Sequence, residues 1–256
     1  MSKKDVTSER PSAINRMALA SNRIKGEWPL PPAPLIFKVI GTDSVEGLLE
    51  SGAGHAKIIR EMLARSGVRV EDFSAILDFG CGVARLLRHF NDLPSTELYG
   101  TDYNPELINW CKRNLPFVHF EVNKLTGGMP YENEKFDLVY LLSVFTHLDE
   151  AQQLFWLDEF ARVLKPRGYL YFTMHGKSQF SAHTPEEAEL FASGELVTRI
   201  DGEAGSNLFN SYASKDYVEK KLIRRYEIIN FIPGGDLSEW KTHDFQPQDS
   251  YLLKKL

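Results

Sequence analysis

Cysteine is scarce in this sequence: its 256 residues include only Cys81 and Cys111. Two cysteines exclude both the disulfide framework of a small secreted protein and the ligand set of an iron–sulfur cluster. Neither belongs to a Cys/His grouping with the spacing of a zinc site. We therefore expect no metal site, and free thiols in a protein of the reducing cytoplasm.

Long apolar runs and an excess of basic residues are also missing. No stretch of about 18 apolar residues is present, so we expect no membrane-spanning helix. The N-terminus, MSKKD, does not open an apolar segment of the kind a signal peptide needs. The formal net charge of −5 provides no attraction for a phosphate backbone. We accordingly expect neither a membrane nor a nucleic acid as partner.

The composition that is present is that of an ordinary globular protein, with 43% hydrophobic and 25% charged residues. The length suits one large α/β domain with an N-terminal extension. Residues 1–28 are polar and mixed in charge, and prolines crowd positions 29–34. Closely spaced prolines favour an extended linker over a helix. We predict an arm and a linker over residues 1–44 and a single domain over residues 45–256.

The order of the apolar segments predicts a parallel sheet with helices on both faces. Residues 45–66 have near-helical apolar spacing, interrupted by the small residues 51–54. Beyond them, short apolar runs alternate with helical patterns, as in βαβ units. The predicted strands are residues 75–79, 97–102, 117–122, 136–142 and 169–174, and the predicted helices are residues 85–90, 106–114 and 150–164.

The C-terminal part of the chain has a different pattern. Residues 226–232 and 250–254 are strand-like runs with no clear helix between them, which predicts an antiparallel hairpin at the edge of the sheet. Residues 176–216 form a long insertion before this hairpin. Long segments at such an edge are often lids or ligand-binding elements, so we expect the insertion to border a binding site.

The most informative motif is ILDFGCGVAR at residues 76–85, between the first predicted strand and a helix. Gly80 and Gly82 permit a sharp turn and a close approach to a ligand. A dinucleotide fingerprint needs a small residue where Arg85 stands, and Asp78 would repel a pyrophosphate. S-adenosylmethionine has no phosphate, and its ammonium group suits a carboxylate. A tight turn without a ligand is the alternative interpretation.

A second acidic residue, Asp102, lies 24 residues after Asp78, at the end of the second predicted strand. A carboxylate at this position accepts hydrogen bonds from a ribose diol. The alternative is a helix cap, because Asn104, Pro105 and Glu106 read as the start of a helix. Tyr103 is expected to pack against an adenine.

Together these segments resemble the class I S-adenosylmethionine-dependent methyltransferases. Residues 77–82, LDFGCG, resemble motif I of that family, with Ala84 in place of its third small residue. The resemblance implies a Rossmann-like three-layer α/β sandwich with a seven-stranded, mostly parallel sheet and an antiparallel C-terminal hairpin. It also implies S-adenosylmethionine as the cofactor. The resemblance continues through residues 120–125, 136–148 and 159–170.

The resemblance also implies where the cofactor binds. Asn123 stands where the family often has an aspartate near the adenine amine, and its side-chain oxygen is able to accept a hydrogen bond from that amine. The predicted cofactor-binding residues are Asp78, Gly80, Cys81, Gly82, Asp102, Tyr103, Asn123, Leu125 and Ser143.

The sequence restricts the methyl acceptor. The chain reads LLSV after the fourth predicted strand, so the Asp/Asn-Pro-Pro-Tyr/Phe signature of enzymes that methylate adenine or glutamine amides is missing. The Pro-Cys pair of C5-cytosine enzymes is missing as well. We expect O- or N-methylation of a small molecule. A protein acceptor, or a non-catalytic binding or scaffold role for the fold, are the alternatives.

Two histidines are candidate bases for a hydroxyl acceptor, because imidazole titrates near neutrality. His147 follows the fourth predicted strand, close to the expected sulfonium, and His175 ends the fifth. The alternatives are structural: a hydrogen-bonded residue at a helix start for His147, and a loop residue for His175.

Overall fold

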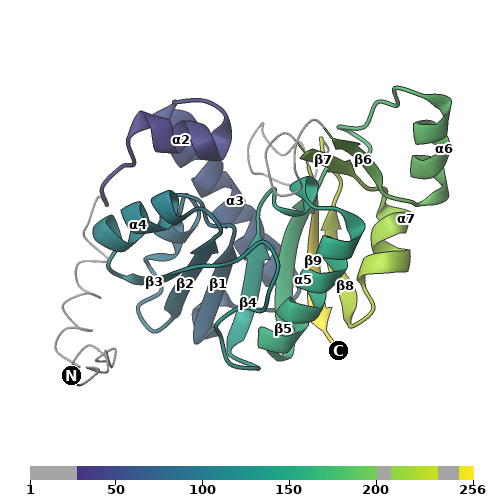
Figure 1. Cartoon of the computed structure of the whole chain (residues 1–256). Coiled ribbons are helices and arrows are strands. Elements are labelled where there is room, and N and C mark those ends of the chain that lie inside the picture. The colour runs from purple at the N-terminus through teal and green to yellow at the C-terminus, as the bar shows by residue number, and fades with distance from the viewer. Residues whose placement is uncertain (1–27, 201–208, 236–247) are drawn as a thin grey trace, which may run out of the picture.

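The computed structural model describes residues 28–200, 209–235 and 248–256. Its centre is a seven-stranded sheet in the order β3-β2-β1-β4-β5-β9-β8 (Figure 1). Strands β1 to β5 are parallel, and β9 is antiparallel to both of its neighbours, which confirms the predicted sheet and hairpin. The strands are β1 Ala75–Phe79, β2 Glu97–Asp102, β3 Val118–Val122, β4 Phe136–Leu141, β5 Leu164–Met174, β8 Tyr226–Ile232 and β9 Asp249–Lys255.

Helices cover both faces of this sheet. In Figure 1, α3 lies behind the sheet and α5 in front of it, so the architecture is the predicted three-layer sandwich. The helices are α2 Ala33–Ile40, α3 Val45–Arg65, α4 Pro105–Asn114, α5 Glu150–Val163, α6 Pro185–Ser193 and α7 Lys215–Tyr217. Shorter helical turns are η1 Val70–Asp72, η2 Leu87–Phe90, η3 Phe145–His147 and η4 Val218–Leu222.

Two apolar cores separate the three layers. Because successive side chains of a strand point to opposite faces, Ile76 packs in the core under α3 and Leu77 in the core under α5. Tyr140 and Val139 of β4 divide between the two cores in the same way. All four side chains are fully buried. The continuous apolar runs of β1 and β4 therefore reflect burial on both faces of the sheet.

Helix α3 is continuous, so the predicted interruption at residues 51–54 is wrong. Ser44 caps its first turn by accepting a hydrogen bond from the Gly47 N–H at 2.9 Å. Gly52 lies inside the helix, where a Cβ atom would come within 2.3 Å of the carbonyl oxygen of Arg85. The glycine allows α3 to pack closely on the loop after β1 and does not end the helix.

Three other predicted boundaries differ from the structure. No α-helix starts at Arg85; Ala84 has the left-handed φ of 59°, and only the short turn η2 follows. Pro34 lies in the first turn of α2, where the missing N–H of proline has no helical partner to lose. Strand β5 begins at Leu164 rather than at Tyr169, with an irregular register against β4.

The N-terminal region is only partly described. Residues 1–27 of the predicted arm lie outside the described residues. The remainder of the predicted linker includes α2, which buries Leu35 and Ile36 in the same core as α3. The arm and the domain boundary after residue 44 stay predictions, while α2 packs with the domain.

The carboxyl ends of the parallel strands form the upper edge of the sheet in Figure 1. Helix α2 stands above this edge on one side. The small antiparallel sheet of β6 Val197–Ile200 and β7 Phe209–Tyr212 stands with α6 on the other side. Open α/β sheets bind ligands at this edge, so the two flanking elements border the expected site.

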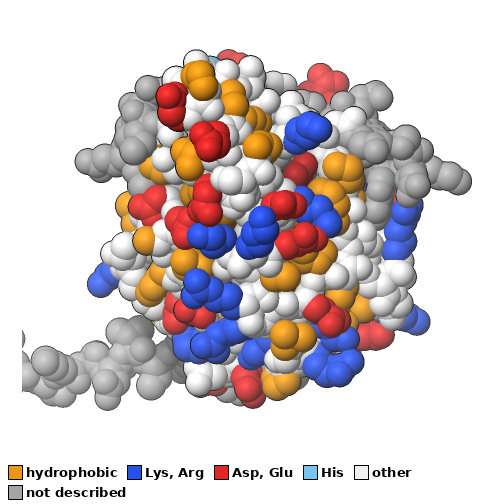
Figure 2. Space-filling view, turned by 90° about the vertical axis from the view of Figure 1, so that its right-hand side faces the viewer, with side chains coloured by type: hydrophobic (Ala, Val, Ile, Leu, Met, Phe, Trp, Pro, Cys, Tyr) orange, Lys and Arg blue, Asp and Glu red, His pale blue; other side chains and the backbone are white. Residues whose placement is uncertain are grey.

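The side of the molecule that carries α6 and α7 has charges of both signs (Figure 2). Lys215 pairs with Glu219, and Lys220 pairs with Asp216. Positive and negative side chains are thus intermixed on this face. Within residues 28–200, 209–235 and 248–256, no helix combines the length and the apolar character needed to span a membrane.

Candidate functional site

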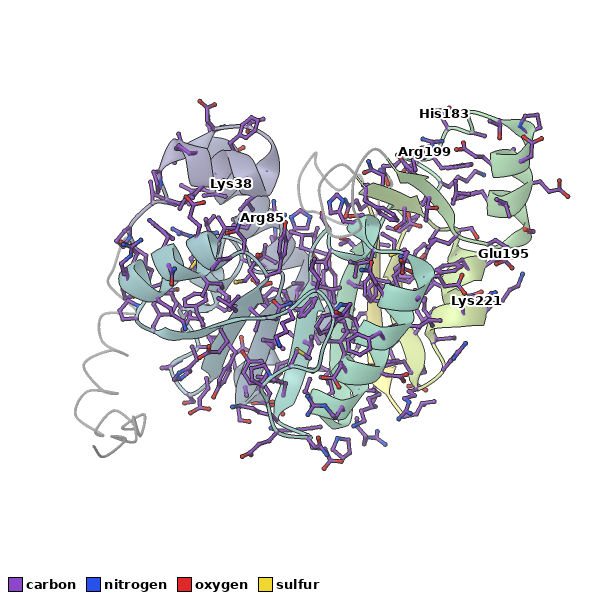
Figure 3. All side chains as sticks on the ribbon, in the orientation of Figure 1. Lys38, Arg85, His183, Glu195, Arg199 and Lys221 are labelled. Atoms are coloured by element: carbon purple, nitrogen blue, oxygen red, sulfur yellow. The ribbon has the colours of Figure 1, made fainter. Side chains whose placement is uncertain are left out.

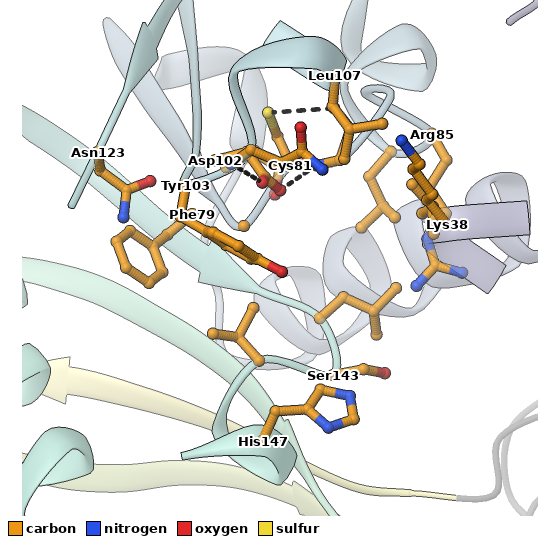
Figure 4. Close-up of a pocket in the computed structure, with 18 of the residues that line it drawn as sticks. Lys38, Phe79, Cys81, Arg85, Asp102, Tyr103, Leu107, Asn123, Ser143 and His147 are labelled. Atoms are coloured by element: carbon orange, nitrogen blue, oxygen red, sulfur yellow. Dashed lines mark hydrogen bonds between the residues drawn. The ribbon is translucent and has the colours of Figure 1, made fainter. Parts of the chain in front are cut away.

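A cavity of about 620 Å³ opens at the carboxyl ends of β1, β2 and β4 (Figure 4). This volume is within the usual range for small-molecule sites. All the predicted cofactor-binding residues line the cavity, as does His147, whereas His175 does not. Three consecutive residues of α2, Phe37, Lys38 and Val39, line it from above.

The turn after β1 depends on its two glycines. Gly80 and Gly82 have φ values of 73° and 56°, a backbone conformation that residues other than glycine rarely adopt. A Cβ atom on Gly80 would lie 2.5 Å from Val144, and one on Gly82 would lie 2.9 Å from Val39. The glycines thus allow the loop after β4 and helix α2 to close on the turn from two sides, a packing reason that the sequence did not reveal.

Asp102 fastens this turn to the end of β2. One carboxylate oxygen accepts a hydrogen bond from the Gly82 N–H at 2.9 Å, and the other accepts from the Asn104 N–H at 2.8 Å. The side chain is buried, which raises the pKa of Asp102. The cap of α4 is Asn104, whose side chain accepts from the Glu106 N–H. Each oxygen of Asp102 therefore keeps a second acceptor position for a ligand at the cavity wall.

Asp78 and Arg85 both line the inner end of the cavity, and burial affects the ionisation of each. Burial raises the pKa of Asp78 to about 8, although the positive charge of Arg85 opposes the shift. Burial lowers the pKa of Arg85 to about 10. Among the described residues, the Arg85 side chain donates to Ser51 Oγ at 3.2 Å, so most of its five N–H donors remain for another partner. The sequence predicted no contact role for Arg85, although its position directly after the glycine turn was a signal that it lines the site.

The opposite end of the cavity has one unsatisfied polar atom. The Asn123 side-chain nitrogen donates to the Lys124 carbonyl at 3.0 Å, whereas its buried oxygen has no hydrogen-bond partner among the described residues. Tyr103 and Leu125 line the cavity beside it, 47% and 40% exposed. An unpaired buried acceptor costs about 1–3 kcal/mol, so this end suits a flat apolar ligand that carries an N–H donor.

His147 has a defined tautomer. Its Nδ1 atom lies 2.8 Å from the Phe209 carbonyl oxygen of β7, and because a carbonyl only accepts, Nδ1–H donates. The other ring nitrogen, Nε2, is then the acceptor in the neutral ring. Burial lowers the pKa of His147, although the bond to Phe209 opposes the shift. The residue is therefore a neutral imidazole at the cavity wall near pH 7, with the protonation state of a base.

Strand β7 holds His147 because a buried polar network ties it to η3. Ser211 of β7 donates to the Phe145 carbonyl at 2.8 Å. The Gln153 side chain donates to the carbonyls of Phe145 and Leu148 at 3.0 and 3.1 Å. The insertion predicted to border the site thus does so by orienting His147.

The structure does not bring His175 into the cavity wall. Its ring packs on Tyr212 of β7, with centroids 5.2 Å apart, and its Nδ1 atom is buried without a partner among the described residues. Burial and the proximity of His147 lower the pKa of His175 to about 4. A base role for His175 stays a prediction that its location does not favour.

Helix α2 contributes residues that the sequence analysis had assigned to a linker. Phe37 lines the cavity and is 59% exposed, and Lys38 pairs with Glu106 of α4. Figure 3 shows Lys38 and Arg85 on the α2 side of the upper edge, across from Arg199 of the insertion. No pattern in residues 33–40 alone reveals this role, because it depends on where α2 packs.

Comparison with protein families gives an independent view of the domain. Residues 77–172 match the family model described as a methyltransferase domain. The matched range includes the glycine turn, Asp102, Asn123 and His147.

Two curated relatives and one solved structure illustrate the similarity. The sterol 24-C-methyltransferase of Schizosaccharomyces pombe is 33% identical over 100 residues, which cover 37% of this chain and 26% of that protein. The demethylmenaquinone methyltransferase of Chlorobaculum parvum is 24% identical over 192 residues, which cover 64% and 78% of the two chains. This chain thus spans about a quarter of the first relative and most of the second. A glycopeptide N-methyltransferase solved with S-adenosylmethionine has a TM-score of 0.54 at 16% identity, covering 80% of this chain and 93% of that one.

Proposed function

Because this chain belongs to the class I S-adenosylmethionine-dependent methyltransferases, we propose that it transfers the methyl group of that cofactor to a hydroxyl group of a small apolar molecule. The observation that carries the proposal is the orientation of His147. Its Nδ1–H is held by the Phe209 carbonyl, and its Nε2 is left as a proton acceptor. A hydroxyl acceptor benefits from such a base, whereas a neutral amine needs none.

The residues of the cavity suit the cofactor at three points. Asp78 and Arg85 together match the ammonium and carboxylate groups of its methionine end. Asp102, with one acceptor position left on each oxygen, matches the ribose diol. The unpaired oxygen of Asn123 matches the adenine amine, with Tyr103 on the cavity wall beside it. The bound cofactor would supply the electrophilic methyl group.

The side chains around His147 support an apolar acceptor. Leu142 and Val144 line the cavity beside it, and Phe37 projects from α2 with 59% of its surface exposed. Described polar groups on this wall are few, so the environment favours binding of apolar surface. Two relatives are named for a sterol and for demethylmenaquinone, which supports an apolar acceptor. Helix α2 lies over the cavity, whereas a protein acceptor needs an open groove.

The residues of the site have separate tasks in this reaction. His147 Nε2 takes the acceptor proton, and the Phe209 carbonyl stabilises the imidazolium that forms. The apolar side chains of Leu142 and Val144 exclude water from the reacting oxygen. Holding the acceptor in line with the leaving group supplies a further large part of the rate.

Two measurements test the proposal. Calorimetry with S-adenosylhomocysteine tests the cofactor site, and absence of binding at millimolar ligand would overturn it. Release of labelled methyl groups onto a panel of apolar phenols and alcohols, with matched amines, tests the acceptor class. Transfer to amines alone would contradict the hydroxyl proposal. Cofactor binding without transfer to any extract or metabolite would favour a binding or scaffold role.

A further inference from the structure

Ser143 has an unusual backbone conformation for its residue type. It follows β4, lines the cavity, and has φ 58°, in the left-handed region that residues with a Cβ atom rarely adopt. Such a conformation persists only when the surrounding structure enforces it, and it is found most often at functional sites. The contacts of Ser143 therefore indicate what holds the loop after β4.

Two side chains, Thr173 of β5 and Gln248 just before β9, hold Ser143. Its backbone N–H donates to Thr173 Oγ1 at 2.9 Å, and its hydroxyl donates to the Gln248 side-chain oxygen at 3.1 Å. Thr173 Oγ1 in turn donates to the same oxygen of Gln248 at 2.5 Å. Gln248 precedes β9, 105 residues from Ser143 in the sequence, so its side-chain oxygen connects the start of β9 to the loop after β4.

The conformation of Ser143 determines two features of the site. It directs Val144 against the glycine turn, where a Cβ atom on Gly80 would lie 2.5 Å from the Val144 side chain. It also begins the short turn that carries His147, because Thr146 Oγ1 donates to the Ser143 carbonyl and the His147 N–H donates to the Val144 carbonyl. A rotation at Ser143 would therefore move both the cofactor turn and the imidazole.

We propose that Gln248 is a positioning residue for the cofactor site: its side-chain oxygen, which accepts from Ser143 and Thr173, holds the loop after β4 in its binding conformation. The proposal rests on the proposed function only in that the cavity takes S-adenosylmethionine, and it is independent of the acceptor. Neither Gln248 nor Thr173 lines the cavity, and both bond to Ser143, which does.

Matched substitutions at position 248 separate positioning from general stability. Gln248→Met has a similar length and no strong acceptor, so the affinity for S-adenosylhomocysteine should fall about tenfold. Gln248→Glu keeps an acceptor oxygen at this position and should retain affinity within about threefold. Asn230→Leu is the control, because Asn230 also donates from the hairpin, to the Met62 carbonyl at 3.5 Å, far from the cavity. Its affinity should equal that of the unaltered protein.

Affinity by calorimetry and melting temperature are measured for every variant. Unchanged affinity in Gln248→Met, or equal losses in Gln248→Met and Gln248→Glu, would overturn the proposal while the proposed function stands. Failure of the unaltered protein to bind would overturn both. Should Gln248→Met not fold, Thr173→Val and Thr173→Ser give the same contrast, with the affinity loss expected only for valine. Equal affinities in that pair would then reject the proposal.

Discussion

The two walls of the cavity are built from different parts of the chain. The cofactor wall comes from consecutive strand ends, with the glycine turn, Asp102 and Asn123 following β1, β2 and β3. The opposite wall is assembled from distant segments: α2 above, and His147 held by Phe209 of β7. The first wall is determined by local sequence and the second by tertiary contacts. Under the proposed function, the cofactor wall binds the common cofactor and the opposite wall selects the acceptor.

The largest expected effect is on the assembled wall. If His147 is the base, His147→Ala should lower turnover by at least about a hundredfold with cofactor affinity nearly unchanged. Because burial lowers the pKa of His147 below its ordinary value of 6.5, activity should fall with decreasing pH only below that value. Steady-state kinetics across pH, on the acceptor identified from the panel, check both statements.

The control for this prediction is His175→Ala. His175 lies outside the cavity wall, so turnover per folded molecule should be preserved in that variant. If His147→Ala instead loses stability while turnover per folded molecule is kept, His147 is structural, and both walls serve only binding and alignment.

The next effect concerns the cofactor wall. Hydrogen bonds from a ribose diol to Asp102 should contribute about 1.5–3 kcal/mol, so Asp102→Ala should weaken S-adenosylhomocysteine binding by roughly tenfold to a hundredfold. The variant also releases the N–H groups of Gly82 and Asn104, so its melting temperature should fall. Asp102→Asn, which retains one acceptor oxygen, should lie between the two proteins. Affinity unchanged in Asp102→Ala would show that the ribose is held elsewhere.

The sequence predicts the residues of the cofactor wall better than those of the opposite wall. Motif and spacing placed the cofactor residues at one edge, because parallel strands bring their carboxyl ends together. They did not place Phe37 or Lys38 at the site, because the proline cluster favoured an extended linker over the helix α2. The spacing also predicted that Gly52 interrupts the helix. This glycine instead permits close contact between α3 and the Arg85 carbonyl. What remained unpredicted depends on contacts between residues far apart in the chain.

A smaller effect is expected from the titration of Asp78. Burial raises its pKa to about 8, so the carboxyl is mostly protonated at neutral pH without a ligand. Since an ammonium group needs the carboxylate, affinity for S-adenosylhomocysteine should increase roughly tenfold between pH 7 and pH 9. Asp78→Asn should bind more weakly and lack this part of the increase, which separates Asp78 from titration of the ligand itself.

The same pKa has a consequence for stability. Because the pKa of Asp78 in the folded protein lies above its ordinary value of 3.8, the stability contributed by the protonated form is lost as pH rises through about 8. The unliganded protein should melt lower at pH 9 than at pH 7, with a smaller decline in Asp78→Asn. Equal declines in the two proteins would assign the loss to other groups.

The smallest effect is expected from an ion pair between helices α2 and α4. Lys38 of α2, at the cavity wall, pairs with Glu106 of α4, with the side chains 43% and 59% exposed. Exposed pairs contribute about 0.2–1 kcal/mol, so Lys38→Ala should speed the release of S-adenosylhomocysteine by at most about fivefold, and less at high salt. Stopped-flow fluorescence measures this rate, with Trp156 at the cavity wall as the reporter.

Lys112→Ala provides the matched control, since Lys112 pairs with Glu121 at 3.4 Å with similar exposures of 45% and 54%, and neither residue lines the cavity. Its release rate should be unchanged. If both variants release the ligand equally fast, the effect of Lys38 is one of overall charge. If neither differs from the unaltered protein at low salt, the burial of Leu35 and Ile36 is sufficient to hold α2 in place. Opening of the site would then require that apolar contact to break, which is a slower and salt-independent process.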